Sequence, residues 1–407
     1  MRTAPATEIS EYSRRYVYTI VGAFAFGWAV LSVDIAVINP LLPLVRTEFQ
    51  LSGAGTGLLT WAFTLPYLLI QIPSGVLADR LGAKRFLVVM TLVSAVGMMA
   101  LGLWSYGLPA LVASAVVNRL GMGVYYPTAF GVAMGSVPTT MRGTASALLV
   151  MGMALGSALG LALAVPLCDL GGNNWRFPML VFGLLTLTLP LIFQTVMRQS
   201  KPLHAVTSRG VTEALRHPHI VLLLIMNFFT NYAFSVVMVW GPSFISSERG
   251  LSLATAGFYI ALVNLIGFPS SLVSGVLSDR IGRRYLTMLL FPVAGTALVA
   301  LASLGEPTIV LAAIVVFGLT GKWTPDVLLA AWMGDHLVAK YPSHAKVIYG
   351  VANTARMSAG VLAPPITGVL LDATGTLSTG FFVAGAVLFA AACLGFLVAE
   401  RRQGTGA

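Results

Sequence analysis

Long apolar stretches alternate with short polar connections along the whole chain. Each stretch is about 20 residues or more, the length at which an α-helix spans roughly 30 Å of hydrocarbon. A membrane β-barrel would instead show segments of about ten residues with alternating polarity. We predict spans over residues 17–44, 55–78, 86–106, 109–136, 143–168, 176–197, 218–245, 252–277, 286–304, 308–336, 346–371 and 376–400. The pattern predicts an all-α membrane protein with 12 transmembrane helices.

The composition agrees with this interpretation. Of the 407 residues, 57% are hydrophobic and only 9% are charged, whereas a soluble domain carries roughly 25% charged residues. The polar N-terminus runs into the first apolar stretch without a small-residue cleavage site, so we expect an uncleaved first helix. The two cysteines, Cys168 and Cys393, suggest neither a disulfide framework nor a metal site.

The halves of the chain resemble each other. The longest polar connection, residues 198–217, divides the chain into an N-terminal six-helix bundle (1–197) and a C-terminal one (218–407). The segment "LSGAGTGLL" at 51–59 parallels "LSLATAGFY" at 251–259, 200 positions later. Two such parallel repeats place the substrate of a transporter between the halves, near the middle of the membrane.

Basic residues predict the orientation. If the N-terminus is cytoplasmic, most of the lysines and arginines outside the spans flank the inner face, and only Arg46, Arg176 and Arg249 flank the outer face. This asymmetry is typical of multi-pass proteins. We expect both termini to be cytoplasmic and the protein to lie in the cell (plasma) membrane. The net charge of +10 then reflects topology and does not indicate a nucleic-acid partner.

A charged motif ends the second helix of each half. "GVLADRLGAKR" occupies 75–85 and "GVLSDRIGRRY" occupies 275–285. An Asp at a helix C-terminus opposes the helix dipole, so each needs an outside partner. The N-termini of helices 11 and 5 begin at the same face, and we expect Asp79 and Asp279 to dock there when the cytoplasmic side is closed. The alternative is a basic cluster that only sets topology. The predicted gating residues are Gly75, Asp79, Arg80, Asp279, Arg280 and Arg284.

These motifs resemble the major facilitator superfamily over essentially the whole chain. Its loop signature is matched twice, and "RLGMGVYYP" (119–127) is similar to the family pattern in helix 4. "NNWRFPML" (173–180) is similar to the opening of helix 6 in that family. The resemblance implies two pseudo-symmetric six-helix bundles that rock about a central cavity lined mainly by helices 1, 4, 7 and 10. A basic residue in helix 11 more weakly resembles the organic-anion and monocarboxylate branches.

Five ionisable residues fall within predicted spans. They are Asp34, Arg119, Lys322, Asp326 and Arg356, with a net charge of +1. Charged groups at membrane depth cost about 2.5–3.5 kcal/mol each, so they usually face a partner or a wet cavity. A surplus positive charge in the cavity favours an anionic substrate.

These charges have structural and functional interpretations. Asp34 and Arg119 are either a neutralising pair or a proton carrier coupled to a substrate-binding cation. Lys322 and Asp326 lie four apart on one helix face, near a kink expected at Pro325, and are likewise either a pair or functional. We assign proton coupling to Asp34 and Asp326.

Arg356 breaks the symmetry of the repeat, because its counterpart in helix 5 is Gly152. If Lys322 and Asp326 neutralise each other, Arg356 is the unpaired charge, and its guanidinium suits a carboxylate. Asn227 and Asn231 form a polar stripe on helix 7 that either binds substrate or joins helices. Tyr126, seven residues after Arg119, packs or contacts substrate. We assign substrate binding to Arg119, Tyr126, Asn227, Asn231, Lys322 and Arg356.

We therefore predict a monomeric secondary transporter that moves a small organic anion, a carboxylate by the charge of the cavity, in symport with protons. Sodium is the alternative coupling ion. The alternative is a proton-driven exporter of drug-like molecules, although the exporters' G-P-x-x-G-G element is replaced by "GSALGL" (156–161). No constellation of an intramembrane enzyme is evident, and we expect no cofactor and no metal site.

Overall fold

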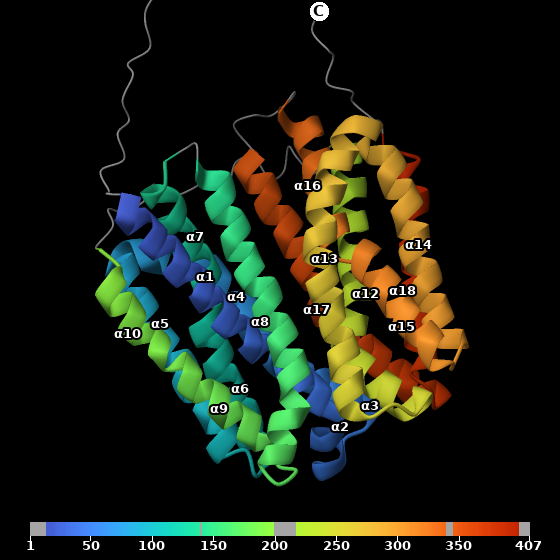
Figure 1. Ribbon diagram of the computed structural model, residues 1–407, viewed down its shortest axis with the longest axis horizontal. Coiled ribbons are helices and arrows are strands. Elements are labelled where there is room, and N and C mark those ends of the chain that lie inside the picture. The colour runs from blue at the N-terminus through green and yellow to red at the C-terminus, as the bar shows by residue number, and fades with distance from the viewer. Residues whose placement is uncertain (1–13, 139–140, 199–216, 339–344, 399–407) are drawn as a thin grey trace, which may run out of the picture. The chain divides into compact units, whose positions relative to one another are not determined.

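A computed structural model of the chain describes residues 14–138, 141–198, 217–338 and 345–398, all of which are helical or lie in short connections. Its helices contain 12 segments long and apolar enough to cross a membrane (Figure 1). The predicted spans are confirmed, with ends that differ by a few residues. The helices are α1 (Arg14–Ala36), α2 (Ile38–Glu48), α3 (Gly53–Ala62), α4 (Leu65–Leu81), α5 (Ala83–Leu103), α6 (Leu108–Gly123), α7 (Tyr125–Ser136), α8 (Arg142–Leu170), α9 (Arg176–Thr186), α10 (Thr188–Val196), α12 (Pro218–Arg249), α13 (Leu253–Ile281), α14 (Arg283–Ser303), α15 (Pro307–Thr320), α16 (Trp323–Val338), α17 (Ala345–Thr374) and α18 (Ser378–Gly395).

Five of the spans are interrupted, and a proline explains each interruption. Proline has no N–H to donate to the carbonyl of the residue four positions earlier, and its ring clashes with that carbonyl. α1, α3, α6 and α9 each end four residues before a proline, at Ala36, Ala62, Gly123 and Thr186. α15 ends five residues before Pro325. The kink expected near Pro325 is confirmed, whereas the other four interruptions were not predicted.

Contacts group the chain into two units. Unit 1 comprises residues 1–34, 66–156 and 179–204, and unit 2 comprises residues 35–65, 157–178 and 205–407. Unit 2 thus contains the six C-terminal spans together with α2, α3 and the last turns of α8. Within unit 2 we call the side at which α2 ends the distal face and the opposite side the proximal face; within unit 1 we call the side at which α1 begins the proximal face. The predicted boundaries of the two six-helix bundles remain a prediction.

Glycines allow close helix packing in unit 1. A Cβ at Gly97 would lie 2.2 Å from the backbone nitrogen of Asn118, and a Cβ at Gly121 would lie 2.3 Å from that of Ser94. α5 and α6 can therefore approach each other backbone to backbone. The Asn118 amide donates to the Ser94 carbonyl at 3.0 Å across this contact.

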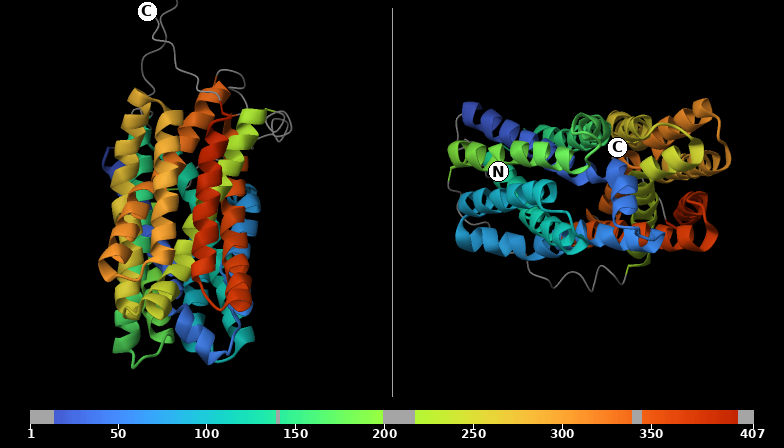
Figure 2. Two further views of the ribbon diagram at one scale, coloured as in Figure 1. Left: turned by 90° about the vertical axis from the view of Figure 1, so that its right-hand side faces the viewer. Right: turned by 90° about the horizontal axis from the view of Figure 1, so that it is seen from below.

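In unit 2 the long helix α12 packs against α13, α17 and α18, and α14 packs against α18 (Figure 1, Figure 2). Their shared core contains the fully buried side chains of Trp240, Phe244 and Phe381. α3 packs along α17, and a Cβ at Gly57 would meet the Pro364 carbonyl at 2.6 Å. These packed elements hold the distal part of unit 2 together.

Acidic side chains fix the distal helix ends. Glu48, at the end of α2, accepts hydrogen bonds from the Trp175 indole at 2.6 Å and from Arg176 at 3.0 Å, at the start of α9. Glu248, exactly one repeat later, accepts from the hydroxyls of Thr376 and Ser378 at the start of α18. An acidic group near a helix N-terminus is favourable because it meets unpaired N–H groups and the positive dipole end.

A third carboxylate joins α17 to α3. Asp372, near the end of α17, accepts the backbone N–H groups of Gly53 at 2.6 Å and Ala54 at 2.7 Å. It therefore caps the N-terminus of α3 from another helix.

Candidate functional site

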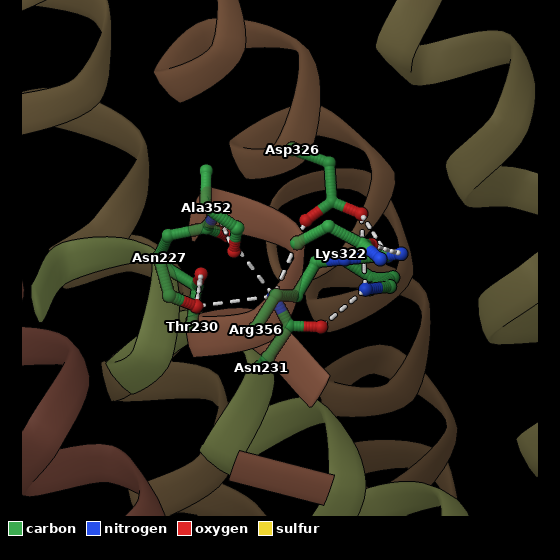
Figure 3. Close-up of polar contacts among 8 residues, drawn as sticks. Asn227, Thr230, Asn231, Lys322, Asp326, Ala352 and Arg356 are labelled. Atoms are coloured by element: carbon green, nitrogen blue, oxygen red, sulfur yellow. Dashed lines mark hydrogen bonds and ion pairs between the residues drawn. The ribbon is translucent and has the colours of Figure 1, made fainter. Parts of the chain in front are cut away.

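Three of the predicted charged residues meet in unit 2. Lys322 lies in the two-residue connection between α15 and α16, and Asp326 lies in the first turn of α16. The Lys322 ammonium is 3.0 Å from Oδ2 of Asp326, and Nη1 of Arg356 on α17 is 3.3 Å from the same oxygen. Figure 3 shows both cations reaching toward this carboxylate. We call these three residues the cation cluster.

The predicted pairing of Lys322 with Asp326 is thus present, but Arg356 is not the unpaired charge that the sequence indicated. Both cations share one carboxylate, so the cluster keeps a net charge of +1. The Lys322 side chain is 4% exposed, that of Asp326 is 19% exposed and that of Arg356 is 27% exposed. Arg356 is therefore the most accessible of the three.

Amide side chains hold the cation cluster in place. The Lys322 ammonium donates to Oδ1 of Asn231 at 2.6 Å, and the Asn231 amide donates to Asn227 and, at 3.4 Å, to Oδ1 of Asp326. Nη2 of Arg356 donates to Oδ1 of Asn353 at 2.9 Å. The polar stripe on α12 is therefore joined to α16 directly, and Asn227 also donates to the Ala352 carbonyl on α17 at 3.4 Å.

An aromatic ring adds to the environment of Lys322. Its ammonium lies 4.6 Å from the centroid of the Phe234 ring, a distance at which the ring face attracts a cation. The low exposure of Lys322 and the surrounding amides make this group a fixed part of the site. A fixed cation beside a partly exposed guanidinium can receive an anion with little rearrangement.

A second polar group lies in unit 1, where three helices are interrupted. Asp34 precedes the end of α1, Arg119 precedes the end of α6, and Thr186 is the last residue of α9. Nη2 of Arg119 donates to the main-chain carbonyl of Asp34 at 3.0 Å, and the Thr186 hydroxyl donates to Oδ2 of Asp34 at 3.0 Å. We call these residues the carboxylate cluster.

The Asp34 carboxylate is buried and incompletely hydrogen-bonded. The residue is 1% exposed, and Oδ1 has no hydrogen-bond partner among the residues that the structure describes. A buried carboxylate oxygen without a donor is costly as an anion and less costly when protonated. This arrangement suits a group that takes up and releases a proton.

Tyr126 contacts other aromatic side chains of unit 1. Arg119 is 2% exposed, whereas Tyr126 follows the interruption at Val124 and is 38% exposed. The Tyr126 ring contacts those of Trp28 and Phe130, at centroid distances of 5.8 and 4.6 Å. Its assignment as a substrate contact remains a prediction.

The predicted gating residues are only partly described. The surroundings of Gly75 and of the Asp79 side chain lie outside the described part of the structure. The side chains of Arg80 and Arg280 are exposed. Asp279 is paired with Arg283 at 3.1 Å, and Arg283 also pairs with Asp335 at 2.8 Å. The predicted docking of the two aspartates on helices 11 and 5 stays a prediction.

The remaining gating residue, Arg284, donates to the Phe396 carbonyl at 2.9 Å, near the end of the described chain. The structure also adds residues that the sequence did not single out, namely Asn353, Thr186, Asp335 and Asp372. The i, i+3 spacing of Asn353 and Arg356 was a usable signal, because such residues share a helix face. The other three lie far in sequence from their partners.

Three histidines gather at the proximal ends of α12 and α16. The ring centroids of His217, His219 and His336 are 5.1–6.1 Å apart. Among the described residues, no group of three or more histidine, cysteine or acidic side chains could hold a metal ion. The five histidines gave no such neighbourhood in the sequence, because two of these three lie more than 100 positions from the third.

Comparison with known proteins identifies the family. The sequence profile of the Major Facilitator Superfamily matches residues 24–364. The chain belongs to this superfamily. The prediction of a transporter rather than an enzyme is thereby confirmed.

Relatives of this transporter are described with different substrates. It is 25% identical to a probable sulfoacetate transporter, SauU, of Cupriavidus necator, over 91% of each chain. It is 26% identical to the multidrug efflux protein YfmO of Bacillus subtilis, over 91% of this chain and 90% of that one. It is also 25% identical to a hexuronate transporter of Bacillus subtilis, over 87% of each chain.

The fold of the transporter is found among solved structures. It resembles a bacterial homologue of the human lysosomal transporter Spinster, in an inward-facing and occupied conformation, with a TM-score of 0.82. The two are 17% identical, over 95% of this chain and 97% of that one. The predicted 12-helix fold of the superfamily is confirmed.

Proposed function

We propose that this transporter moves a small organic anion, bearing a carboxylate or sulfonate group, across the cytoplasmic membrane by alternating access coupled to protons. The observation that carries the proposal is the cation cluster, in which Lys322 and Arg356 share the single carboxylate of Asp326. An anion that docks on Arg356 neutralises the surplus charge and can form a bidentate pair with its guanidinium. Sulfoacetate and hexuronates, the substrates in the names of two relatives, are such anions.

Proton coupling is assigned to the carboxylate cluster. Asp34 is buried with one unpartnered oxygen, so its charge state affects the energy of the carboxylate cluster. Proton uptake removes the charge that faces Arg119 and changes how strongly the two groups attract each other. Asp326 is the second coupling candidate, because it competes with the substrate for the same cations.

The proposed orientation places the proximal face, and both termini, in the cytoplasm. It rests on the asymmetry of basic residues along the sequence. The distal face then carries only Arg46, Arg176 and Arg249 as arginines outside the membrane. A single-cysteine scan with an impermeant reagent on intact cells tests this orientation.

The substrate assignment is tested by uptake into proteoliposomes that contain the purified transporter. We expect uptake of radiolabelled sulfoacetate or glucuronate to be driven by an imposed pH gradient and to be lost in Arg356→Gln. Arg15→Gln, which removes an exposed arginine at the proximal end of α1, is the matched control and should transport normally. Normal uptake by Arg356→Gln would refute the assignment of Arg356.

A multidrug exporter is the second candidate, because one relative has that name. Export of a cationic drug would require surplus acid at the binding site, whereas the cation cluster has surplus positive charge. Two results together would favour this second candidate. Cells that express the transporter would extrude ethidium in a proton-driven manner, and proteoliposomes would take up neither sulfoacetate nor glucuronate.

A further inference from the structure

The three arginines of the distal face differ in what they bind. Arg176 pairs with Glu48, and Arg249 donates to the carbonyls of Leu301 and Ala302. Arg46, on α2, donates only through Nε, to the Leu51 carbonyl at 3.1 Å, and its two terminal nitrogens have no partner among the described residues. Two of the three arginines therefore bind other parts of the protein through their guanidinium groups, whereas Nη1 and Nη2 of Arg46 can bind a ligand.

Arg46 lines a cavity of about 500 Å³ that lies between α2 and α12 within unit 2. Its other polar lining residues include Thr47, Gln50, Ser243 and Ser246. The two serines are three positions apart on α12 and so share a face of that helix. Neither hydroxyl has a hydrogen-bond partner among the residues that the structure describes.

The charges around this cavity favour an anion. Arg46 is the only charged residue among its described lining residues. The nearby carboxylates are hydrogen-bonded elsewhere, since Glu48 binds Arg176, Glu248 binds the start of α18, and Asp372, which also interacts electrostatically with Arg46, caps α3. The size lies within the range of sites that enclose small molecules. Trp240 forms an apolar part of the wall, which suits the carbon skeleton of an organic ion.

We propose that this distal cavity is a docking site for a small organic carboxylate or sulfonate, distinct from the cation cluster. Arg46 holds the anionic group through Nη1 and Nη2, and Ser243 and Ser246 donate to its oxygens. The assignment of the ligand class rests on the proposed function. The site would raise the local concentration of the anion at the distal face before, or after, its passage through the membrane.

The test uses protection of a cysteine in the cavity. Thr47 is an exposed lining residue whose hydroxyl bonds only within α2, to the Pro43 carbonyl, so Thr47→Cys leaves the proposed ligands intact. This change is made in a protein that also carries Cys168→Ser and Cys393→Ser. The purified protein is labelled with a maleimide in the presence of sulfoacetate or glucuronate. The reference sample contains sodium chloride at equal ionic strength. Use of purified protein makes the result independent of orientation.

We expect one of these organic anions, at about ten times its dissociation constant, to slow the labelling of Thr47→Cys about tenfold, because only the unoccupied fraction of the protein reacts. Arg46→Gln should abolish this protection, because it removes the cation. Ser303→Cys, at the exposed distal end of α14, is the control and should be labelled at the same rate with or without the anion. Absence of protection, or equal protection in Arg46→Gln, would overturn the proposal.

The variant Arg356→Gln separates the two proposals. Protection at Thr47→Cys should persist in it although transport is lost, because the two sites bind independently. Loss of protection in Arg356→Gln would show that the cysteine reports the cation cluster, and the distal site would then be rejected. If Arg356→Gln transports normally and the protection still depends on Arg46, the proposed function of the cation cluster is rejected. The distal site is then retained.

Discussion

Asp326 acts as the resting counter-ion of two cations. Its carboxylate contacts Lys322 and Arg356, so an incoming anion must compete with it. A buried charge that loses its partner is strongly destabilised, by about 3–5 kcal/mol for a fully buried pair. The competition therefore keeps the empty site stable and keeps substrate binding reversible.

Replacement of Asp326 by Asn tests this balance. We expect Asp326→Asn to lower the melting temperature, because two cations then repel each other without a shared anion. Sulfoacetate or glucuronate should raise the melting temperature of the variant more than that of the wild type, since ligand binding stabilises the folded state by mass action. Thermal melts with and without each anion measure both effects. An anion-induced shift smaller than that of the wild type would contradict the counter-ion role.

Asp34 makes a separate prediction at the other cluster. Asp34→Asn keeps the hydrogen bond of the Thr186 hydroxyl possible but removes the titrating group. We expect uphill uptake driven by a pH gradient to be lost, while exchange of labelled for unlabelled substrate continues. Uptake and counterflow in proteoliposomes measure the two activities. Asp169→Asn, at an exposed carboxylate near the end of α8, is the control; unchanged uphill uptake by Asp34→Asn would make Asp34 structural.

The sequence predicted part of the two clusters. Helical spacing indicated that Lys322 and Asp326 share a face, with a neutralising pair as one of two interpretations. They are paired, although Lys322 lies just before the start of α16. Helical spacing did not predict that Arg356 shares the same carboxylate, since this contact depends on how α17 packs against α16. The bond from Thr186 to Asp34 was missed for the same reason, as it joins residues 152 positions apart. Contacts within a helix follow from periodicity, and contacts between helices require the packing.

At the scale of the helices, periodicity located the spans but not their interruptions. Pro40 and Pro127 each lie four residues after a helix end, whereas Pro242 and Pro269 lie inside the continuous helices α12 and α13. Proline removes one backbone bond in every case, and neighbouring helices can compensate for that loss within a membrane. The composition of a single helix therefore does not reveal which prolines interrupt it.

The contact of α3 with α17 depends on glycine. A Cβ at Gly57 would lie 2.6 Å from both the Pro364 carbonyl oxygen and Cα of Pro365. We expect Gly57→Ala to destabilise the protein by about 1–3 kcal/mol, because these backbone atoms cannot yield without separating the helices. Melting of the purified variant measures the loss. Gly22→Ala on α1, where a Cβ would meet nothing within 4 Å, should melt as the wild type does; equal effects of the two substitutions would contradict the packing argument.

Asp372 stabilises the N-terminus of α3, and this contact can be tested. Its two hydrogen bonds to Gly53 and Ala54 cap a helix N-terminus, a contact of about 1 kcal/mol. We expect Asp372→Asn to increase the rate at which a maleimide labels Thr60→Cys, a buried position on α3. The control is Glu306→Gln, at the exposed start of α15. If the labelling rate of Thr60→Cys is the same in Asp372→Asn and in the wild type, the cap does not hold α3 closed.

At the scale of the whole molecule, departures from the repeat separate scaffold from function. Glu48 and Glu248 occupy equivalent positions and tie equivalent helices, so the repeat retains them for structure. Arg356 has glycine at the equivalent position, 152, in the alignment of helices 5 and 11. This residue belongs to the proposed substrate site. A symmetric scaffold with asymmetric charges is expected of a transporter whose two halves move alike but bind differently.

Alternating access makes the last prediction. Spin labels at Leu58 and Val369, both exposed positions on α3 and α17, report the distal ends of helices 2 and 11. Labels at Leu81, the proximal end of helix 2, and at Thr354, in the proximal half of helix 11, report the other side. If the transporter opens one face while it closes the other, the two distances should change in opposite directions when sulfoacetate or glucuronate is added and the pH is changed. The reason is that a ligand shifts the populations of interconverting states that it binds unequally. Double electron–electron resonance measures both distances. A proximal distance that stays constant under conditions that support transport would rule out rocking of these helices. It would also rule out the predicted docking of Asp79 on helix 11 in only one of two states.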